Sequence, residues 1–133
     1  MQPGQMNGSD WAMLREQVAT IQAVVKKKYG VTFDQSVADL GALQRLVDDG
    51  VYDDTHPDEL RAMGAVLGNV IAKQLGFEWV LVDDEPALKL KAANTLIVKP
   101  LKVIGERLRT ATRVDVVSVY NGIKSDAKNT RIL

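Results

Sequence analysis

The stretch GFEWVLVDDEPALKLKAANTLIVKP, residues 76–100, decides the fold of this chain. Phe77, Trp79 and Leu81 alternate with a glutamate and two valines, which predicts a strand with one strongly apolar face and one partly apolar face. Residues 83–86, DDEP, predict a turn, because aspartate and proline are typical turn residues. The sequence therefore predicts a central strand that is covered by helices and has Trp79 in the core.

Two further strands are predicted after this turn. Residues 87–92, ALKLKA, alternate apolar residues with lysine, and residues 95–99, TLIVK, form a short apolar run that ends before Pro100. Consecutive strands joined by short loops predict a three-stranded antiparallel meander.

Helical patterns flank the meander on both sides. Three helices are predicted before it and a short one after Pro100, which with the sheet gives an α+β fold with C-terminal helix or helices packed on the sheet. The three N-terminal helices are predicted over residues 9–29, 36–49 and 57–75. Residues 114–123 fit a helix capped by Asp115, whereas their β-branched content favours a strand, and we predict a helix there.

The helix ends and the buried stripes are read from spacing and capping residues. In the first helix, Ser9 or Asp10 is the expected cap, and the inward stripe is Trp11, Leu14, Val18, Ile21 and Val25. In the second, Ser36 and Asp39 resemble a capping box. In the third, Gly64 and Gly68 each lower helix propensity, so we expect another backbone to approach closely there.

Length and composition predict one globular domain. The chain has 133 residues, and we expect a disordered tail over 1–8, a single α+β domain over 9–123 and a polar tail over 124–133. Because there is no cysteine, a disulfide scaffold, a thiolate zinc site and a cysteine nucleophile are excluded. No apolar run is long enough to span a bilayer and no secretory signal is present, so we expect a soluble cytoplasmic protein.

Charge is segregated along the sequence although the net charge is zero. Residues 34–59 hold eight acids and one base, whereas residues 89–131 hold ten bases and three acids. One interpretation is two solvated faces. Another is that the two regions face each other, within one molecule or between the copies of a homodimer.

No motif in the sequence indicates catalysis. His56 is the only histidine, it adjoins a turn, and no nucleophile elbow or glycine-rich phosphate loop is present. We therefore expect no catalytic residue, no cofactor and no metal, although the acidic stretch 48–59 could hold a cation. Nucleic acid is not an expected partner, because Tyr120 is the only aromatic residue in the basic region.

Residues 58–123 carry glycine, tryptophan and proline landmarks in a set order. They are Leu67-Gly68, Leu75-Gly76-Phe77 leading into Trp79, Asp83 or Asp84 at the turn, Val98-Lys99-Pro100, Ile104, Arg107 and Val114-Asp115. This order resembles a bacterial domain-of-unknown-function family, number 3806. The resemblance implies a small α+β domain with no assigned activity, and it carries over no site residue. Glu85-Pro86 departs from the glycine-type turn that the family pattern leads us to expect.

Two functional hypotheses follow. The first is a non-enzymatic binding or protein-interaction module, whose partner is another protein or a second copy of the chain. The alternative is a small-ligand or enzymatic site beside the sheet. The residues that we expect to line that second site are Trp79, Asp83, Lys99 and Arg107.

Overall fold

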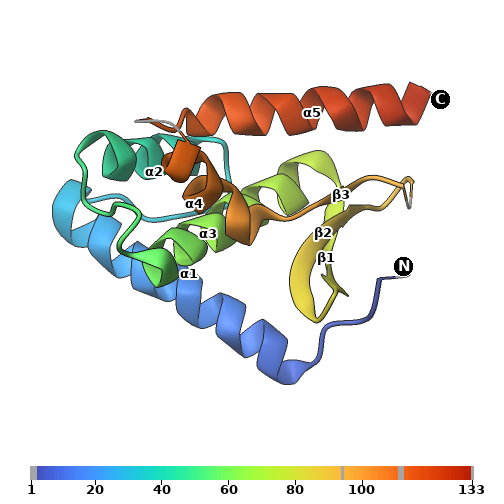
Figure 1. Cartoon of the computed structure of the whole chain (residues 1–133), viewed down its shortest axis with the longest axis horizontal. Coiled ribbons are helices and arrows are strands. Elements are labelled where there is room, and N and C mark those ends of the chain that lie inside the picture. Colours follow the sequence, from blue (N-terminus) through green and yellow to red (C-terminus); the bar gives the residue numbers. More distant parts are fainter. Residues whose placement is uncertain (1–2, 94, 111–112, 133) are drawn as a thin grey trace.

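A computed structural model describes residues 3–93, 95–110 and 113–132 of the chain. In that part, the chain forms five helices and a three-stranded antiparallel sheet, and α3 and α4 pack on the sheet, which confirms the predicted α+β class (Figure 1). The elements are α1 (Gly8–Tyr29), α2 (Ala38–Asp48), α3 (Pro57–Leu75), β1 (Phe77–Val82), β2 (Glu85–Leu90), β3 (Ile97–Val98), α4 (Pro100–Thr110) and α5 (Val116–Ile132). No helix in the described residues is long and apolar enough to cross a membrane.

Helix α3 forms the centre of the core. It packs against α1, α2, α4, α5 and the sheet, so it is buried on nearly every side (Figure 1). Its bounds agree with the predicted range of 57–75. The prediction was possible because residues at each end of the helix determine where it starts and stops. Pro57 occupies the first turn, where no amide hydrogen is needed, and Gly76 ends the helix in the left-handed region at φ 74°.

The two glycines of α3 let other residues approach its axis. A Cβ on Gly64 would lie 2.3 Å from the Pro100 carbonyl oxygen and 2.7 Å from the Leu101 Cα. This confirms the expected approach of another backbone. At Gly68 the neighbour is instead a side chain, since a Cβ there would lie 2.4 Å from the indole ring of Trp79. The two glycines thus seat α4 and β1 against α3.

The sheet is the predicted meander, in the order β1-β2-β3, but β1 is an edge strand and not the predicted central strand, because β2 lies between the other two. β1 pairs with β2 so that Trp79 lies opposite Leu88, and the hairpin turns at Asp83 and Asp84. Both aspartates have positive φ, 53° and 62°, as a two-residue hairpin loop of the type I′ kind requires. Aspartate tolerates this region better than most residues, so the turn needs no glycine.

Pro86 is accommodated because of the register. Leu81 directs both of its backbone groups away from β2, where it donates to Gly4 O at 2.8 Å and accepts from Gly4 N at 2.7 Å. Pro86 lies opposite Leu81. In an antiparallel ladder this is a pair without mutual hydrogen bonds, so the missing amide hydrogen of proline costs no bond to β1.

The N-terminal segment differs from the expected disordered tail. Gly4 forms an isolated antiparallel bridge with Leu81, and Met6 is buried in the core. Helix α1 then begins with a capping box in which Asn7, rather than Ser9 or Asp10, is the cap. Trp11 is also placed differently, because it is 41% exposed although the predicted stripe includes it.

Helix α2 starts later than predicted and without the expected capping box. Its cap is Val37, which makes no side-chain bond, and Val37 is exposed. Asp39 turns back instead and accepts the backbone N–H groups of Asp34 and Gln35. The side chain of Asp39 therefore fixes the loop before α2 instead of the first turn of the helix.

The ambiguous segment after residue 113 is a helix, as predicted. Asp115 Oδ1 accepts the Ser118 N–H at 3.0 Å, and the helix continues as far as Ile132. The expected polar tail from 124 onward is therefore helical. The reason is visible in the spacing, since buried Ala127 extends the stripe of Val116 and Tyr120 onto α2 and α3.

One ion pair joins the acidic and basic regions within a single chain. Arg113 Nε lies 3.0 Å from Asp48 Oδ1. Beside it, Gln44 of α2 donates to Val114 O at 2.9 Å and accepts from Val116 N at 2.8 Å. The charge segregation is thus used partly to dock the start of α5 on α2.

We expect Tyr29 to make stability fall at high pH. Burial, and then the hydrogen bond to Asp49 at 2.5 Å, raise the pKa of Tyr29 to about 12 from its usual 10.0. The folded protein therefore favours the neutral phenol, so this contribution is complete below pH 10 and is lost as the pH rises to 12. In denaturant unfolding between pH 10 and pH 12, the free energy of unfolding should fall more steeply for the native chain than for Tyr29→Phe. Equal slopes for the two proteins would contradict this assignment.

Candidate functional site

The four side chains predicted to line a site do not form one. Asp83 and Lys99 are brought together, with Lys99 Nζ 3.9 Å from Asp83 Oδ2, but both are well exposed. Arg107 is exposed on the last turns of α4. Trp79 is only 8% exposed, and the hollow that it lines contains none of the other three.

His56 closes its own turn. It lies before α3, and its Nδ1 is 3.0 Å from Asp53 Oδ1. Two hydrogen bonds from Thr55, and then the bond with His56, lower the pKa of Asp53 to about 2. Among the described residues, no group of three or more histidine or acidic side chains is arranged to hold a metal ion. The contacts of His56 therefore stabilise the loop.

Trp79 connects the sheet to α3 through a polar contact. Its Nε1 donates to Asn69 Oδ1 at 3.0 Å, and its ring covers Gly68. The oxygen of Asn69 accepts this bond. The NH₂ of the same side chain makes no hydrogen bond to the described residues. The sheet thus orients an amide donor of α3 toward a concave surface.

A hollow of about 560 Å³ lies where α1 meets α3 and the loop before α2. We name it the Asp39 hollow. Its walls are mostly apolar, with a few polar groups. The lining residues are Trp11, Leu14, Arg15, Val18, Ala19, Gln22, Phe33, Asp34, Gln35, Asp39, Val66 and Asn69. This mixture is typical of small binding sites, in which few polar groups fix orientation.

The polar wall of the Asp39 hollow is held rigidly. Asp39 is 2% exposed, and its carboxylate accepts Gln35 N–H at 2.8 Å and Asp34 N–H at 3.3 Å. Gln22 holds the same loop from α1, donating to Val31 O at 2.9 Å and accepting from Phe33 N at 2.7 Å. Burial, which outweighs these amide contacts, raises the pKa of Asp39.

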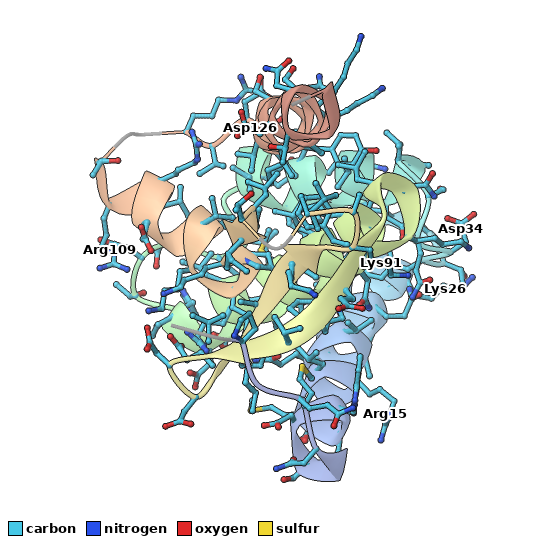
Figure 2. All side chains as sticks on the ribbon, turned by 90° about the vertical axis from the view of Figure 1, so that its right-hand side faces the viewer. Arg15, Lys26, Asp34, Lys91, Arg109 and Asp126 are labelled. Atoms are coloured by element: carbon cyan, nitrogen blue, oxygen red, sulfur yellow. The ribbon has the colours of Figure 1, made fainter. Side chains whose placement is uncertain are left out.

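A second hollow, of about 580 Å³, follows the outer edge of β1. We name it the β1-edge hollow. It lies between the N-terminal segment, β1 and the end of α3, and its residues are Gln5, Met6, Trp11, Gln35, Asn69, Ala72, Lys73, Phe77, Glu78, Trp79, Val80 and Lys91. Figure 2 shows Lys91 after β2 and Arg15 on α1 on the same side of the molecule, with Arg109 on the opposite side.

The two hollows adjoin at three shared residues, Trp11, Gln35 and Asn69. Together we call them the Trp11 groove. It extends from the edge of the sheet, past the exposed indole of Trp11, to the buried carboxylate of Asp39. Sequence reasoning missed Asn69 and Asp39 as members of a site, because Asn69 belongs to no motif and Asp39 was assigned to the capping box of α2. It also assigned Trp11 to the core.

The fold and the groove define a small α+β domain with a concave surface made of two adjoining hollows. The family described as "Domain of unknown function (DUF3806)" matches residues 39–120, which is more than half of the chain. The chain therefore belongs to this family, which confirms the resemblance seen in the sequence. The match begins at Asp39, so it includes α2, which the resemblance over 58–123 leaves outside. Trp11 lies outside the matched segment.

A solved structure shows the same fold. A protein of Bacteroides thetaiotaomicron, with a crystal structure at 1.50 Å resolution, is similar with a TM-score of 0.81 and 19% identity. The similarity covers 90% of this chain and 46% of that one, so the chain spans about half the length of that protein. A search of curated proteins gave no match.

Proposed function

We propose that this chain is a non-enzymatic binding module that holds a segment of a protein partner in the Trp11 groove. The observation that carries the proposal is the exposure of Trp11, 41%, at the junction of two hollows. Tryptophan is enriched among the few interface residues that dominate affinity, where it fills or borders a concave surface. An exposed indole in that place is a suitable anchor for a partner.

The rest of the groove supports recognition of a peptide-like partner. Leu14 and Val66 provide a buried apolar floor beside Trp11. The NH₂ of Asn69 and the guanidinium of Arg15 supply donors that have no partner among the described residues. The apolar floor can accept one apolar side chain of a bound chain segment. The separate N–H donors can bind carbonyl oxygens of the same segment.

The polar groups of the groove favour binding over chemistry. Asp39 and Gln22 each hold the backbone of the 31–35 loop, and Asn69 holds the indole of Trp79. In the described part of the chain, none of them is hydrogen-bonded to a serine, threonine, lysine or histidine side chain. These contacts give the groove a fixed shape, which lowers the entropic cost of binding a partner.

We expect Trp11→Ala to weaken partner binding about 30-fold, because a hot-spot residue contributes at least about 2 kcal/mol. A displayed library of short linear peptides would be selected on the native chain, and the affinity of the best synthetic peptide would be measured by fluorescence anisotropy. Met13 is the matched control, since it is 43% exposed on the same helix but lines neither hollow of the groove. Met13→Ala should change the affinity less than about twofold. Selection of no peptide that depends on Trp11 would overturn the proposal.

A second candidate function is the binding of a small protonated amine in the Asp39 hollow. The specific observation is that the Asp39 carboxylate is 2% exposed, accepts two backbone N–H groups and lies beside the carboxyl of Asp34, with no cationic side chain as a partner among the described residues. A cation would offset the cost of its burial, and the rings of Trp11 and Phe33 line the same hollow. Small primary amines should then raise the Tm of the native chain but not that of Asp39→Asn. An equal effect on both proteins would eliminate this candidate.

A further inference from the structure

Strand β1 has an open edge at Trp79. In an antiparallel ladder, both backbone groups of one residue point to the same side, and the side alternates along the strand. Leu81 points outward, because it bonds to Gly4. Trp79, two residues earlier, therefore points its N–H and C=O outward as well. The register leaves these two groups without a strand partner among the described residues, and they border the β1-edge hollow.

The N-terminal segment shows that this edge accepts an antiparallel strand. Gly4 makes both hydrogen bonds of a ladder pair with Leu81, at 2.7 and 2.8 Å. The next pair of that ladder would involve Trp79, but the segment leaves the edge at Met6 to enter α1. The edge of β1 is therefore paired at Leu81 and open at Trp79, the next residue whose backbone groups point outward. Open strand edges are the surfaces to which extended peptides add.

The charge beside the open edge indicates what the added segment carries. Lys73 and Lys91 line the β1-edge hollow, and both are exposed. Among the described residues, Glu78 is the only acid that lines this hollow, and it is paired with Lys89 at 3.1 Å. The two lysines are thus not offset within the hollow, so this end of the groove favours an acidic group. Lys91 N bonds to Gly76 O, which places Lys91 opposite the residue three positions before Trp79.

We propose that the partner, on the function proposed above, is an extended acidic segment that adds to β1 as an antiparallel strand and pairs with Trp79. Antiparallel chains run in opposite directions, so the partner residue that lies opposite Gly76 follows the pairing residue by three positions. Because Lys91 lies beside Gly76, we expect the acidic residue at about that position, at about 3.3 Å of strand per residue. The partner's pairing residue donates to Trp79 C=O and accepts from Trp79 N–H. The residue that follows it directs its N–H group away from β1, and the partner's strand begins at the pairing residue because Gly4 and Gln5 hold the edge beyond it.

N-methylation of the library-selected peptide, one position at a time, tests the strand directly. Methylation of the residue that pairs with Trp79 should weaken binding at least about tenfold, because it removes one ladder bond and places a methyl group against β1. Methylation of the residue that follows it should have an effect below about twofold, because that N–H points away from β1. The amide hydrogen of Trp79 should also exchange more slowly with solvent when the peptide is bound.

A charge series on the native chain tests the second part of the proposal. Lys73→Gln and Lys91→Gln should each weaken binding roughly twofold to fivefold, the range for exposed ion pairs, and the effect should shrink in high salt. Lys128→Gln on α5, exposed and outside the groove, is the control and should not change the affinity.

Three results would overturn strand addition. They are a peptide whose N-methyl series shows no alternation, unchanged exchange at the Trp79 amide, and a chain that dimerises through this edge at the concentrations used. If binding still depends on Trp11 in the first two cases, the proposed function stands and only its mode is wrong. If no selected peptide depends on Trp11, both proposals fail.

Discussion

Gly64→Ala is expected to lower the free energy of unfolding by about 3 kcal/mol. The added methyl carbon would lie 2.3 Å from the Pro100 carbonyl oxygen and 2.7 Å from the Leu101 Cα. Both atoms belong to backbone at the start of α4, so no side-chain rotation can relieve the overlap. Alanine raises helix propensity by about 1 kcal/mol, which offsets only part of this cost. Denaturant unfolding followed by circular dichroism measures the change.

Gly41→Ala is the matched control for this prediction. Gly41 also lies inside a helix, and a Cβ there would meet no atom within 4 Å. We expect this variant to be as stable as the native chain or more stable by up to about 1 kcal/mol. If Gly64→Ala were equally harmless, α4 would not be seated on α3 as described.

Asp39→Ala is expected to cost about 2 kcal/mol of stability, because two backbone N–H groups lose their acceptor. One of them belongs to Gln35, whose φ of 66° is unusual for a residue other than glycine and is held by this contact. The same substitution should loosen the wall of the Asp39 hollow. Thermal and denaturant unfolding of the native and variant chains would give the difference.

Asp58→Ala is the appropriate comparison for Asp39→Ala. Each aspartate is the second residue of its helix, Asp39 in α2 and Asp58 in α3, but Asp58 is exposed. Its replacement should change stability by less than about 0.5 kcal/mol. A similar cost for both variants would show that Asp39 acts only as a charge near a helix start and that its two amide contacts contribute nothing.

Local signals in the sequence were sufficient for the central part of the fold. Helix α3 has a proline at its start and a glycine at its end, and both signals act within a few residues. The meander followed from alternation in the first two strands and from the turn residues that separate the strands. The family resemblance added no site, and its landmark Trp79 proved to be a structural residue that orients Asn69.

The groove could not be predicted, because it depends on contacts between distant segments. Helical spacing placed Trp11 in the buried stripe of α1, but this part of the helix lies at the junction of two hollows and leaves the indole exposed. Asp39 has the spacing of a capping box with Ser36, yet it bonds to the preceding loop. Spacing along one element does not show which neighbour covers it.

The most direct test of the Trp11 groove uses the indole N–H signals of the protein in heteronuclear NMR. The chain has two tryptophans, so each signal can be assigned with one variant. During titration with the selected peptide, we expect the Trp11 indole signal to shift progressively until saturation. The Trp79 indole, which is bonded to Asn69, should move less, while its backbone amide becomes protected. Saturation of binding with an unchanged Trp11 signal would contradict the account.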